Sequence, residues 1–311
     1  MDMIKGITFY PFAPRGSFIK GEVRTSLSVM KERTGADTVV LVPAGIQQTP
    51  QSVEIDWQSP QTVSDSELCE LIRYAKTLGL KVFLKPTVNC ANGVWRAHIN
   101  FFDEEVPCEP KWSEWFRAYT EFQMHYARIA EELHCEMFIT GCEMVMSERR
   151  EREWRSLIKA VKEVYHGPVS YNTDKYQEHN VSWWDCVDVI SSSGYYPADD
   201  WENQLDRIEK VVRRYKKPFF FAEAGCMSTA GSREVPNNWE LHGEVDLEGQ
   251  RVWYENMFTA VTKRDWIKGA VLWSWDGRLY DGWKAKEDLH YEFYQKPAEA
   301  VIRKYFTENW T

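Results

Sequence analysis

The sequence lacks any long apolar segment and any run of basic residues. No stretch reaches the roughly 18 apolar residues of a membrane-spanning helix, so we expect no membrane partner. The net charge of −9 argues against nucleic-acid binding, because contacts to phosphate need a surface rich in Lys and Arg. Residues 1–5 contain no apolar signal segment. We therefore expect a soluble, cytoplasmic protein, with secretion after removal of a signal as the alternative.

Motifs for metal ions, disulfides and phosphate groups are also missing. The seven cysteines are an odd number and form no CxxC pair, which argues against a disulfide framework and a zinc site. The seven histidines include no HxH or HExxH motif, and none ends a predicted strand. No glycine-rich turn of the phosphate-binding type follows the last two predicted strands. We expect no metal and no cofactor.

Tryptophan, by contrast, is abundant. The chain contains 15 Trp beside 15 Tyr and 15 Phe. Several of these Trp lie in polar, loop-like stretches: Trp57, Trp95, Trp201, Trp239 and Trp283. An indole ring is apolar on its face and polar at its edge, which suits a hydrated recognition surface. Packing is the better interpretation for any single Trp, but the excess in loops favours a ligand with flat apolar faces and many hydroxyls, such as a sugar.

Short apolar runs alternate with helical patterns along the whole chain. The spacing predicts eight strands, at 6–10, 37–42, 81–85, 136–143, 168–172, 187–191, 218–223 and 269–275. Helices are predicted at 24–34, 64–79, 112–133, 150–165, 200–216, 248–264 and 296–306. The pattern predicts a single (β/α)8 TIM barrel over residues 1–311. The longest irregular stretches, 43–63, 86–111, 224–247 and 276–295, all follow a strand, on the side where barrels place their sites.

Two of the predicted strands end on a carboxylate. Glu143 ends the fourth strand and Glu223 ends the seventh, within the apolar stretch 218–225. Such a residue is most often a solvated rim charge, but a carboxylate among apolar neighbours is costly to bury without a partner. In a barrel, both side chains would lie at the same mouth. Two carboxyl groups are what the hydrolysis of a glycosidic bond needs, because one protonates the leaving oxygen and the other attacks or activates water.

This arrangement resembles the clan A retaining glycoside hydrolases, which have an acid/base Glu after strand four and a nucleophile Glu after strand seven. Within the clan, the chain is most similar to family 113, the small β-1,4-mannanases, through the segments 6–10, 138–143, 193–197, 220–225 and 272–276. The resemblance implies that Glu143 is the acid/base, that Glu223 is the nucleophile, and that the activity is that of an endo-β-1,4-mannanase. Its substrate would be mannan or manno-oligosaccharides, cleaved by double displacement, with transglycosylation as a further possibility. The chain departs from many clan A families at Cys142, where they have an Asn that contacts the sugar 2-hydroxyl, so that contact must come from elsewhere.

Further residues at the same mouth are candidates for substrate binding. Tyr196 could donate a hydrogen bond to Glu223 and keep it ionised, with Tyr195 as its competitor. Lys85 could bind sugar hydroxyls or pair with a carboxylate, and Trp273 could form the floor under the sugar ring or fill the barrel core. The remaining candidates are polar or aromatic residues of the loops and the last strand: Asn89, Asn172, Asn237, Trp95, Trp239, Trp275 and Asp276.

Several alternatives stay open on the residues alone. Mannose as the sugar rests on the resemblance, so another clan A enzyme (a β-glucanase, galactanase, xylanase or exo-β-glycosidase) fits the pattern equally well. A sugar-binding barrel without catalysis is disfavoured by the presence of both glutamates. A metal-dependent hydrolase is disfavoured by the positions of the histidines. We expect a monomer, and the sequence does not distinguish endo from exo cleavage, the number of subsites or the tolerance of galactose branches.

Overall fold

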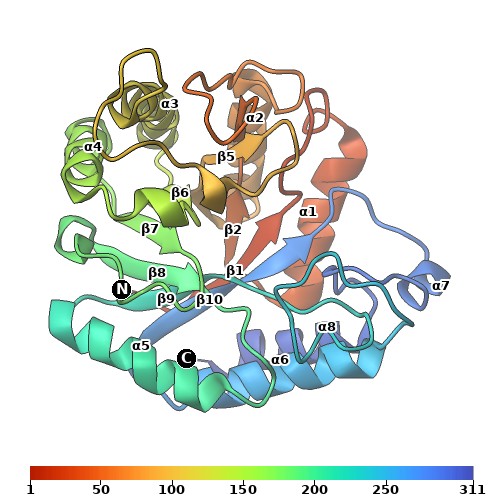
Figure 1. Cartoon of the computed structure of the whole chain (residues 1–311). Helices are drawn as coiled ribbons and strands as arrows, with labels where there is room; N and C mark the ends of the chain where they lie inside the picture. Colours follow the sequence, from red (N-terminus) through yellow and green to blue (C-terminus); the bar gives the residue numbers. More distant parts are fainter. Residues whose placement is uncertain (311) are drawn as a thin grey trace.

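The computed structural model describes residues 1–310, and its centre is a closed barrel of eight parallel strands (Figure 1). Around the barrel the strands follow the order β1-β10-β9-β8-β7-β6-β4-β2. The barrel strands are β1 (Ile4–Phe9), β2 (Thr38–Leu41), β4 (Lys81–Leu84), β6 (Met137–Cys142), β7 (Val169–Thr173), β8 (Val189–Ser193), β9 (Phe219–Ala224) and β10 (Ile267–Trp275). Each of them overlaps a strand predicted from the sequence, so the predicted TIM-barrel fold is confirmed.

Helices surround this barrel on the outside (Figure 1). They are α1 (Gly21–Thr34), α2 (Asp65–Thr77), α3 (Trp112–Glu132), α4 (Glu151–Val164), α5 (Trp201–Tyr215), α6 (Leu247–Val261), the short α7 (Gly282–Ala285) and α8 (Pro297–Lys304). Helix α2 begins with the capping box that the sequence predicts, in which Ser64 and Glu67 satisfy each other's backbone N–H groups. Only a short 3-10 helix, η3 (Trp184–Cys186), lies between β7 and β8. Within residues 1–310, no helix is both long enough and apolar enough to cross a membrane.

Two short strands lie beyond the barrel, in stretches predicted to be irregular. β3 (Ala44–Gln47) follows β2, β5 (Thr87–Cys90) follows β4, and the two pair in parallel. Each is separated from its barrel strand by a proline, Pro43 or Pro86, which has no N–H to donate to the sheet. These strands are not recognisable from the sequence, because four residues carry too little periodicity. Together they extend the barrel wall on the side of β2 and β4.

The hydrophobic core has two parts, one inside the barrel and one between the barrel and the helices. The inner part contains Ile4, Val40, Val42, Phe83, Met137, Ile139, Val189, Phe220, Ala222 and Val271. These side chains are buried, so the barrel interior is packed. The outer part is much larger and joins the other faces of the strands to the helices. Because the interior is filled, a ligand has access only to the ends of the strands.

The strand that carries Glu223 contains an extra residue near its end. Ser192 and Ser193 of β8 pair with Phe221 and Glu223, so one residue of β9 has no counterpart. Residues alternate between the two faces of a strand, and Phe220 and Ala222 belong to the inner core, which would place Glu223 on the outer face. The extra residue reverses the alternation, as β-bulges next to active sites do. It brings the side chain of Glu223 to the barrel mouth.

Strand β6 has the same kind of irregularity. Ile139 pairs with Ser170 and Cys142 pairs with Asn172, so β6 advances by three residues where β7 advances by two. Gly141 lies in this extra step with a φ of 156°, and a Cβ there would come within 2.5 Å of the Tyr119 hydroxyl. The irregular step turns Cys142 towards Glu223 and places Glu143 directly after the strand.

Candidate active site

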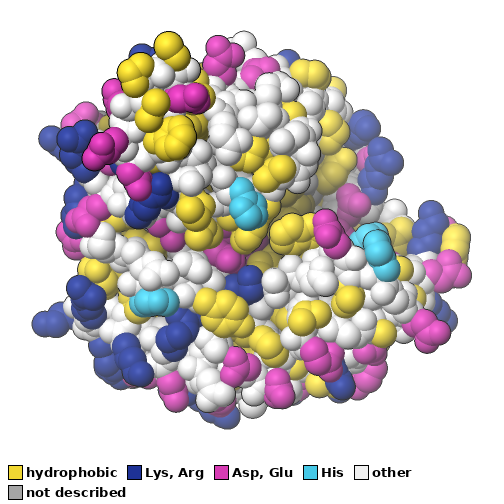
Figure 2. All heavy atoms as spheres, in the orientation of Figure 1, with side chains coloured by type: hydrophobic (Ala, Val, Ile, Leu, Met, Phe, Trp, Pro, Cys, Tyr) yellow, Lys and Arg dark blue, Asp and Glu magenta, His cyan; other side chains and the backbone are white. Residues whose placement is uncertain are grey.

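A cavity of about 800 Å³ lies at the carboxyl ends of the barrel strands. A hollow is visible near the middle of the face shown in Figure 2, with hydrophobic, acidic and basic side chains close together at its edge. The residues that line the cavity come from the barrel mouth and its long loops: Phe12, Ile46, Gln61, Asn89–Ala91, Gly93–Arg96, Glu143, Asp174, Lys175, Tyr195, Glu223, Asn237–Glu240, Trp273 and Tyr291. All four of the long irregular stretches predicted from the sequence, 43–63, 86–111, 224–247 and 276–295, contribute to this list.

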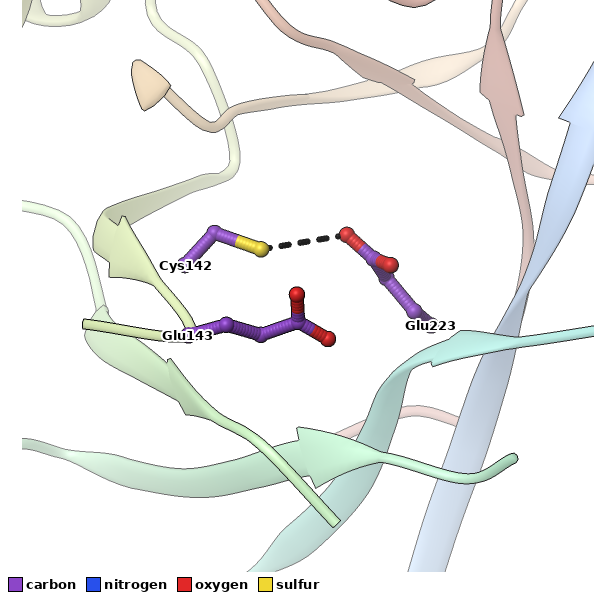
Figure 3. Close-up of side chains that lie close together, drawn as sticks. All are labelled: Cys142, Glu143 and Glu223. Atoms are coloured by element: carbon purple, nitrogen blue, oxygen red, sulfur yellow. Dashed lines mark hydrogen bonds between the residues drawn. The ribbon is translucent and has the colours of Figure 1, made fainter. Parts of the chain in front are cut away.

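Glu143 and Glu223 face each other in this cavity from opposite sides (Figure 3). One oxygen of each carboxylate lies within 4.8 Å of the other, and Sγ of Cys142 lies within the same distance of both. The two residues are only 7% and 5% exposed. Retaining glycosidases hold their two carboxyl groups about 5–5.5 Å apart, whereas inverting enzymes leave about 6.5–9.5 Å for a water molecule. The separation here fits the retaining geometry.

Glu223 is held by three donors. The Nζ of Lys85, which is fully buried, forms an ion pair with Oε1, and the Cys142 thiol lies 3.2 Å from the same oxygen. The Tyr195 hydroxyl donates a hydrogen bond to Oε2 at 2.9 Å. Lys85 is itself oriented by a hydrogen bond of 3.3 Å to Oδ1 of Asn172. These contacts leave the Glu223 carboxylate little freedom to rotate.

Glu143 is held by a different set of donors. The Ser193 hydroxyl donates to Oε1 at 2.7 Å. The indole Nε1 of Trp95 donates to Oε2 at 3.2 Å, and Nη1 of Arg96 lies 3.4 Å from the same oxygen. Arg96 also donates to Oδ1 of Asn89 at 2.8 Å. The acid/base candidate is therefore tied mainly to the loop after β5, whereas Glu223 is tied to the barrel strands.

The two carboxyl groups have pKa values shifted in opposite directions. Burial and the nearby Glu223 charge raise the pKa of Glu143, against the opposing effect of Arg96. Burial also acts to raise the pKa of Glu223, but the Lys85 ammonium group, its hydrogen bond and Arg96 outweigh it, and the pKa is lowered. An acid and an ionised carboxylate in one site are the two forms that a double displacement requires at the start of the reaction.

The same group of side chains offers three potential metal ligands, Cys142, Glu143 and Glu223. Both carboxylates are already paired with cations, Lys85 and Arg96, which would repel a metal ion at this position. Burial raises the pKa of the Cys142 thiol well above its usual value, whereas a metal ion binds the thiolate. The chemistry of the group fits a carboxylate pair better than a metal site.

The structure corrects the role predicted for Tyr196. Its hydroxyl donates to Oε1 of Glu178 at 2.7 Å, in a buried network outside the cavity, and the neighbouring Tyr195 makes the contact with Glu223 instead. Adjacent residues leave a chain in different directions, and the sequence alone could not show which of the two faces the mouth. Tyr195 is the alternative that the sequence offers for this role.

The structure also separates the two tryptophans at the end of β10. Trp273 lines the cavity, 5.8 Å from Phe12 between ring centroids, and the Lys85 ammonium group lies 5.8 Å from its ring centre. Trp275 was predicted to bind substrate, but it is 1% exposed, points away from the cavity and donates from Nε1 to the Ser26 hydroxyl at 3.0 Å. Trp275 and the adjacent Asp276, whose carbonyl accepts from Ser26, join β10 to α1.

The other predicted binding residues lie close to where the sequence analysis placed them. Asn89, Asn237, Trp95 and Trp239 line the cavity. The rings of Trp95 and Trp239 meet edge to face at 5.8 Å, which joins the loops after β5 and β9. Asn172 is buried. Its Oδ1 accepts a hydrogen bond from Lys85, and its Nδ2 donates to the Thr173 carbonyl and the Ser193 hydroxyl.

The three remaining loop tryptophans do not line the cavity. Trp201 begins α5, within the helix predicted at 200–216. It is 2% exposed and packs against Trp253, so it belongs to the core and not to a recognition surface. Trp57 packs against Phe122, and Trp283 is exposed on α7.

Several residues of the site were not predicted from the sequence. Arg96 and Ser193 contact Glu143 directly, and Asp174 and Tyr291 line the cavity. Burial and the Glu143 charge raise the pKa of Asp174 to about 7. The position of Ser193 at a strand end was a usable signal, because two other strands of the same barrel supply Glu143 and Glu223 at their ends. Arg96 lies within a long loop, and nothing in its neighbours indicated that it would turn inward.

Comparison with known families and structures gives consistent results. The model of Glycoside Hydrolase Family 113 matches residues 7–296. A solved structure described as a complex of a GH113 β-1,4-mannanase is 53% identical to this chain, with a TM-score of 0.98, and the match covers 99% of this chain and 100% of that one. The GH113 β-mannanase AaManA from Alicyclobacillus acidocaldarius, in complex with ManMIm, is 40% identical, with a TM-score of 0.95 and coverage of 99% and 98%.

More distant similarities are limited to the fold. A β-glucuronidase from Ruminococcus gnavus has a TM-score of 0.66 and 13% identity, over 98% of this chain and 50% of that one. At this identity the match reflects the shared barrel. No curated protein matches the sequence.

We expect Lys85→Met to weaken both the fold and the site. Removing one partner of a buried ion pair costs about 3–5 kcal/mol of unfolding free energy, because the other charge stays buried and unpaired. Without the ammonium group the pKa of Glu223 rises, so the acidic limb of the kcat/KM profile moves to higher pH. Denaturant unfolding and a pH profile measure the two effects. Lys263→Met, which removes an exposed ion pair with Glu202, serves as the control, and an unmoved acidic limb in Lys85→Met would contradict the assignment.

Trp273 and Trp275 are expected to respond differently to substitution. Trp273→Ala removes a ring from the cavity and should lower kcat/KM about tenfold or more, with little loss of stability. Trp275→Phe removes the hydrogen bond to Ser26 and should lower the unfolding free energy by about 1 kcal/mol while KM stays unchanged. Steady-state kinetics and thermal unfolding of both variants measure this contrast. A raised KM in Trp275→Phe would contradict this distinction and indicate that Trp275 contributes to substrate binding.

Proposed function

Because the chain belongs to glycoside hydrolase family 113, we propose that it is a retaining endo-β-1,4-mannanase that cleaves mannan and manno-oligosaccharides. The two relatives named as β-mannanases are 53% and 40% identical to it over 99% of its length. The observation that carries the mechanism is the buried carboxyl pair, with oxygens within 4.8 Å and pKa values shifted in opposite directions.

In the first step, the Glu223 carboxylate attacks C1 of the sugar while Glu143 gives its proton to the departing glycosidic oxygen. The C1–O bond to the leaving sugar breaks, and a glycosyl ester with Glu223 forms. Lys85 and Tyr195 keep the nucleophile ionised and fixed in orientation before the attack. The raised pKa of Glu143 keeps its proton available for transfer.

In the second step, the roles of the carboxyl groups change. The ester carries no negative charge, so the repulsion that adds to burial in raising the pKa of Glu143 is gone, and that pKa falls. Arg96 and Trp95, which donate to Oε2, stabilise Glu143 as a carboxylate. Glu143 takes a proton from water while the water oxygen attacks C1 and the ester bond breaks. Two inversions at C1 give net retention. A sugar hydroxyl that replaces water would give transglycosylation.

The lining of the cavity suits a chain of sugars. The rings of Trp273, Trp95 and Trp239 offer flat apolar surfaces to sugar faces. Asn237 and Asp174 offer hydrogen-bonding groups to hydroxyls on the same walls. A cavity that combines aromatic surfaces with a few polar groups is typical of carbohydrate recognition. The identity of the sugar as mannose is supported by the named relatives.

Product analysis tests the substrate and the stereochemistry together. Incubation with mannohexaose is expected to yield shorter manno-oligosaccharides whose new reducing ends are initially β-anomers, because the carboxylate separation supports retention. Cello- and xylo-oligosaccharides in parallel reactions should be cleaved much more slowly. Proton NMR in the first minutes follows the anomer before mutarotation. Initial α-anomers would contradict the mechanism, and faster cleavage of another series would reassign the substrate.

Replacement of the nucleophile tests its role directly. Glu223→Ala should lower kcat by roughly 10⁴-fold or more, since the covalent step is lost. Azide can enter the space left by the side chain and attack C1, which yields an α-mannosyl azide of inverted configuration. Mass spectrometry and NMR identify this product. Glu234→Ala, at an exposed residue of the loop after β9, is the control that should retain activity. Unchanged activity in Glu223→Ala would exclude Glu223 as the nucleophile.

A further inference from the structure

The backbone at Glu143 has an unusual conformation. Its φ is 54°, in the left-handed region that residues with a side chain rarely adopt. Such a conformation persists only where the surrounding structure fixes it, and it often occurs at active sites. The conformation begins directly after β6, where the chain leaves the barrel wall.

Strand β7 supplies the contacts on both sides of this residue. The N–H of Glu143 donates to the Asn172 carbonyl at 2.7 Å. The N–H of Met144 donates to the Tyr171 hydroxyl at 3.1 Å. The second bond is made by a side chain, so a substitution can remove it without changing the sheet.

The Tyr171 hydroxyl is oriented in turn by a buried carboxyl group. It donates to Oε1 of Glu148 at 2.8 Å, and the Thr173 hydroxyl donates to the same oxygen at 2.6 Å. Glu148 is 2% exposed and does not line the cavity. Its other oxygen, Oε2, is buried without a hydrogen-bond partner among residues 1–310. Burial raises the pKa of Glu148 to about 8, so the neutral acid predominates at pH 7.

The segment that connects Glu143 to Glu148 is anchored as well. The indole of Trp154 donates to the Ser147 carbonyl at 3.0 Å, and that of Trp183 donates to the Glu148 carbonyl at 3.0 Å. These fixed points hold the carboxyl group of Glu148 where it meets Tyr171. A chain of hydrogen bonds therefore leads from Glu148 through Tyr171 to the peptide that follows Glu143.

We propose that Tyr171 and Glu148 are positioning residues for the acid/base, which hold the peptide after Glu143 so that its carboxyl group faces Glu223. The proposal rests on the function proposed above. Neither residue touches the reacting atoms, and both act through the backbone of Glu143. Their loss should impair proton transfer by Glu143 more than attack by Glu223, since Glu223 is held by a separate set of donors.

The experiment compares substrates that differ in their need for an acid. Manno-oligosaccharides need a proton on the leaving oxygen, whereas 2,4-dinitrophenyl β-mannobioside releases a stable anion without one. Tyr171→Phe should lower kcat on mannohexaose about tenfold at nearly unchanged KM, which corresponds to the loss of one hydrogen bond. The burst of dinitrophenolate from the activated substrate should keep its wild-type rate constant.

Azide provides a second readout. After the burst, turnover of the activated substrate depends on Glu143 as the base. Azide needs no base: it attacks C1, the ester bond to Glu223 breaks, and a β-mannosyl azide forms. Azide should therefore accelerate steady-state turnover several-fold in Tyr171→Phe and little in the wild type. A residue with a purely structural role would not produce this difference.

Further variants separate positioning from packing. Glu148→Gln mimics the neutral acid and should retain most activity at pH 7, whereas Glu148→Ala should behave like Tyr171→Phe. Tyr165→Phe is the matched control, because it removes a buried hydroxyl that donates to the Cys135 carbonyl outside the cavity, and it should leave both substrates unaffected. Thermal unfolding verifies that each variant is folded.

The outcomes distinguish the two proposals. Equal losses on both substrates without azide acceleration, or no loss at all in Tyr171→Phe, would overturn the positioning role. If the wild type cleaves a different β-glycoside in preference to mannan, the proposed substrate fails. The same comparison of leaving groups then applies to that glycoside, and positioning is still tested.

Discussion

The site depends on a balance of buried charges. Two carboxylates within 4.8 Å of each other, each less than a tenth exposed, would repel strongly in a medium of low polarity. Lys85 and Arg96 compensate this repulsion unequally, since Lys85 pairs closely with Glu223 while Arg96 lies 3.4 Å from Glu143. Because of this difference, the pKa of Glu223 is lowered and favours the ionised form, whereas the pKa of Glu143 is raised and favours the protonated form. Their different chemical roles therefore arise from their surroundings.

The geometry of the pair depends on irregularities in two strands. Regular alternation would leave Glu223 on the outer face of β9, and the extra residue in that strand turns it to the mouth. Strand β6 contains a similar step, with Gly141 at a position where a Cβ would collide with Tyr119. The packed barrel interior keeps both strands in place, so these local deviations are fixed at the active site.

The cavity walls are built by loops that carry their own structure. β3 and β5 pair beyond the barrel, and the second of them leads into the segment of Trp95 and Arg96, which contact Glu143. The rings of Trp95 and Trp239 then join this loop to the one after β9. The indole of Trp95 thus connects the aromatic wall of the cavity to the acid/base candidate Glu143. This arrangement links the shape of the cavity to the environment of Glu143.

The sequence by itself determined the alternation of strands and helices, the closed barrel and the candidate pair Glu143 and Glu223, because periodicity and carboxylates at strand ends are local patterns. It also indicated Lys85, directly after β4, and Trp273, near the end of β10. Only the tertiary structure decided that Tyr195 faces Glu223 while Tyr196 faces Glu178, that Trp275 packs against α1, and that Arg96 turns inward. Those choices depend on bulges, loop paths and distant partners, which bring together residues far apart in the chain and leave no periodic trace in the sequence.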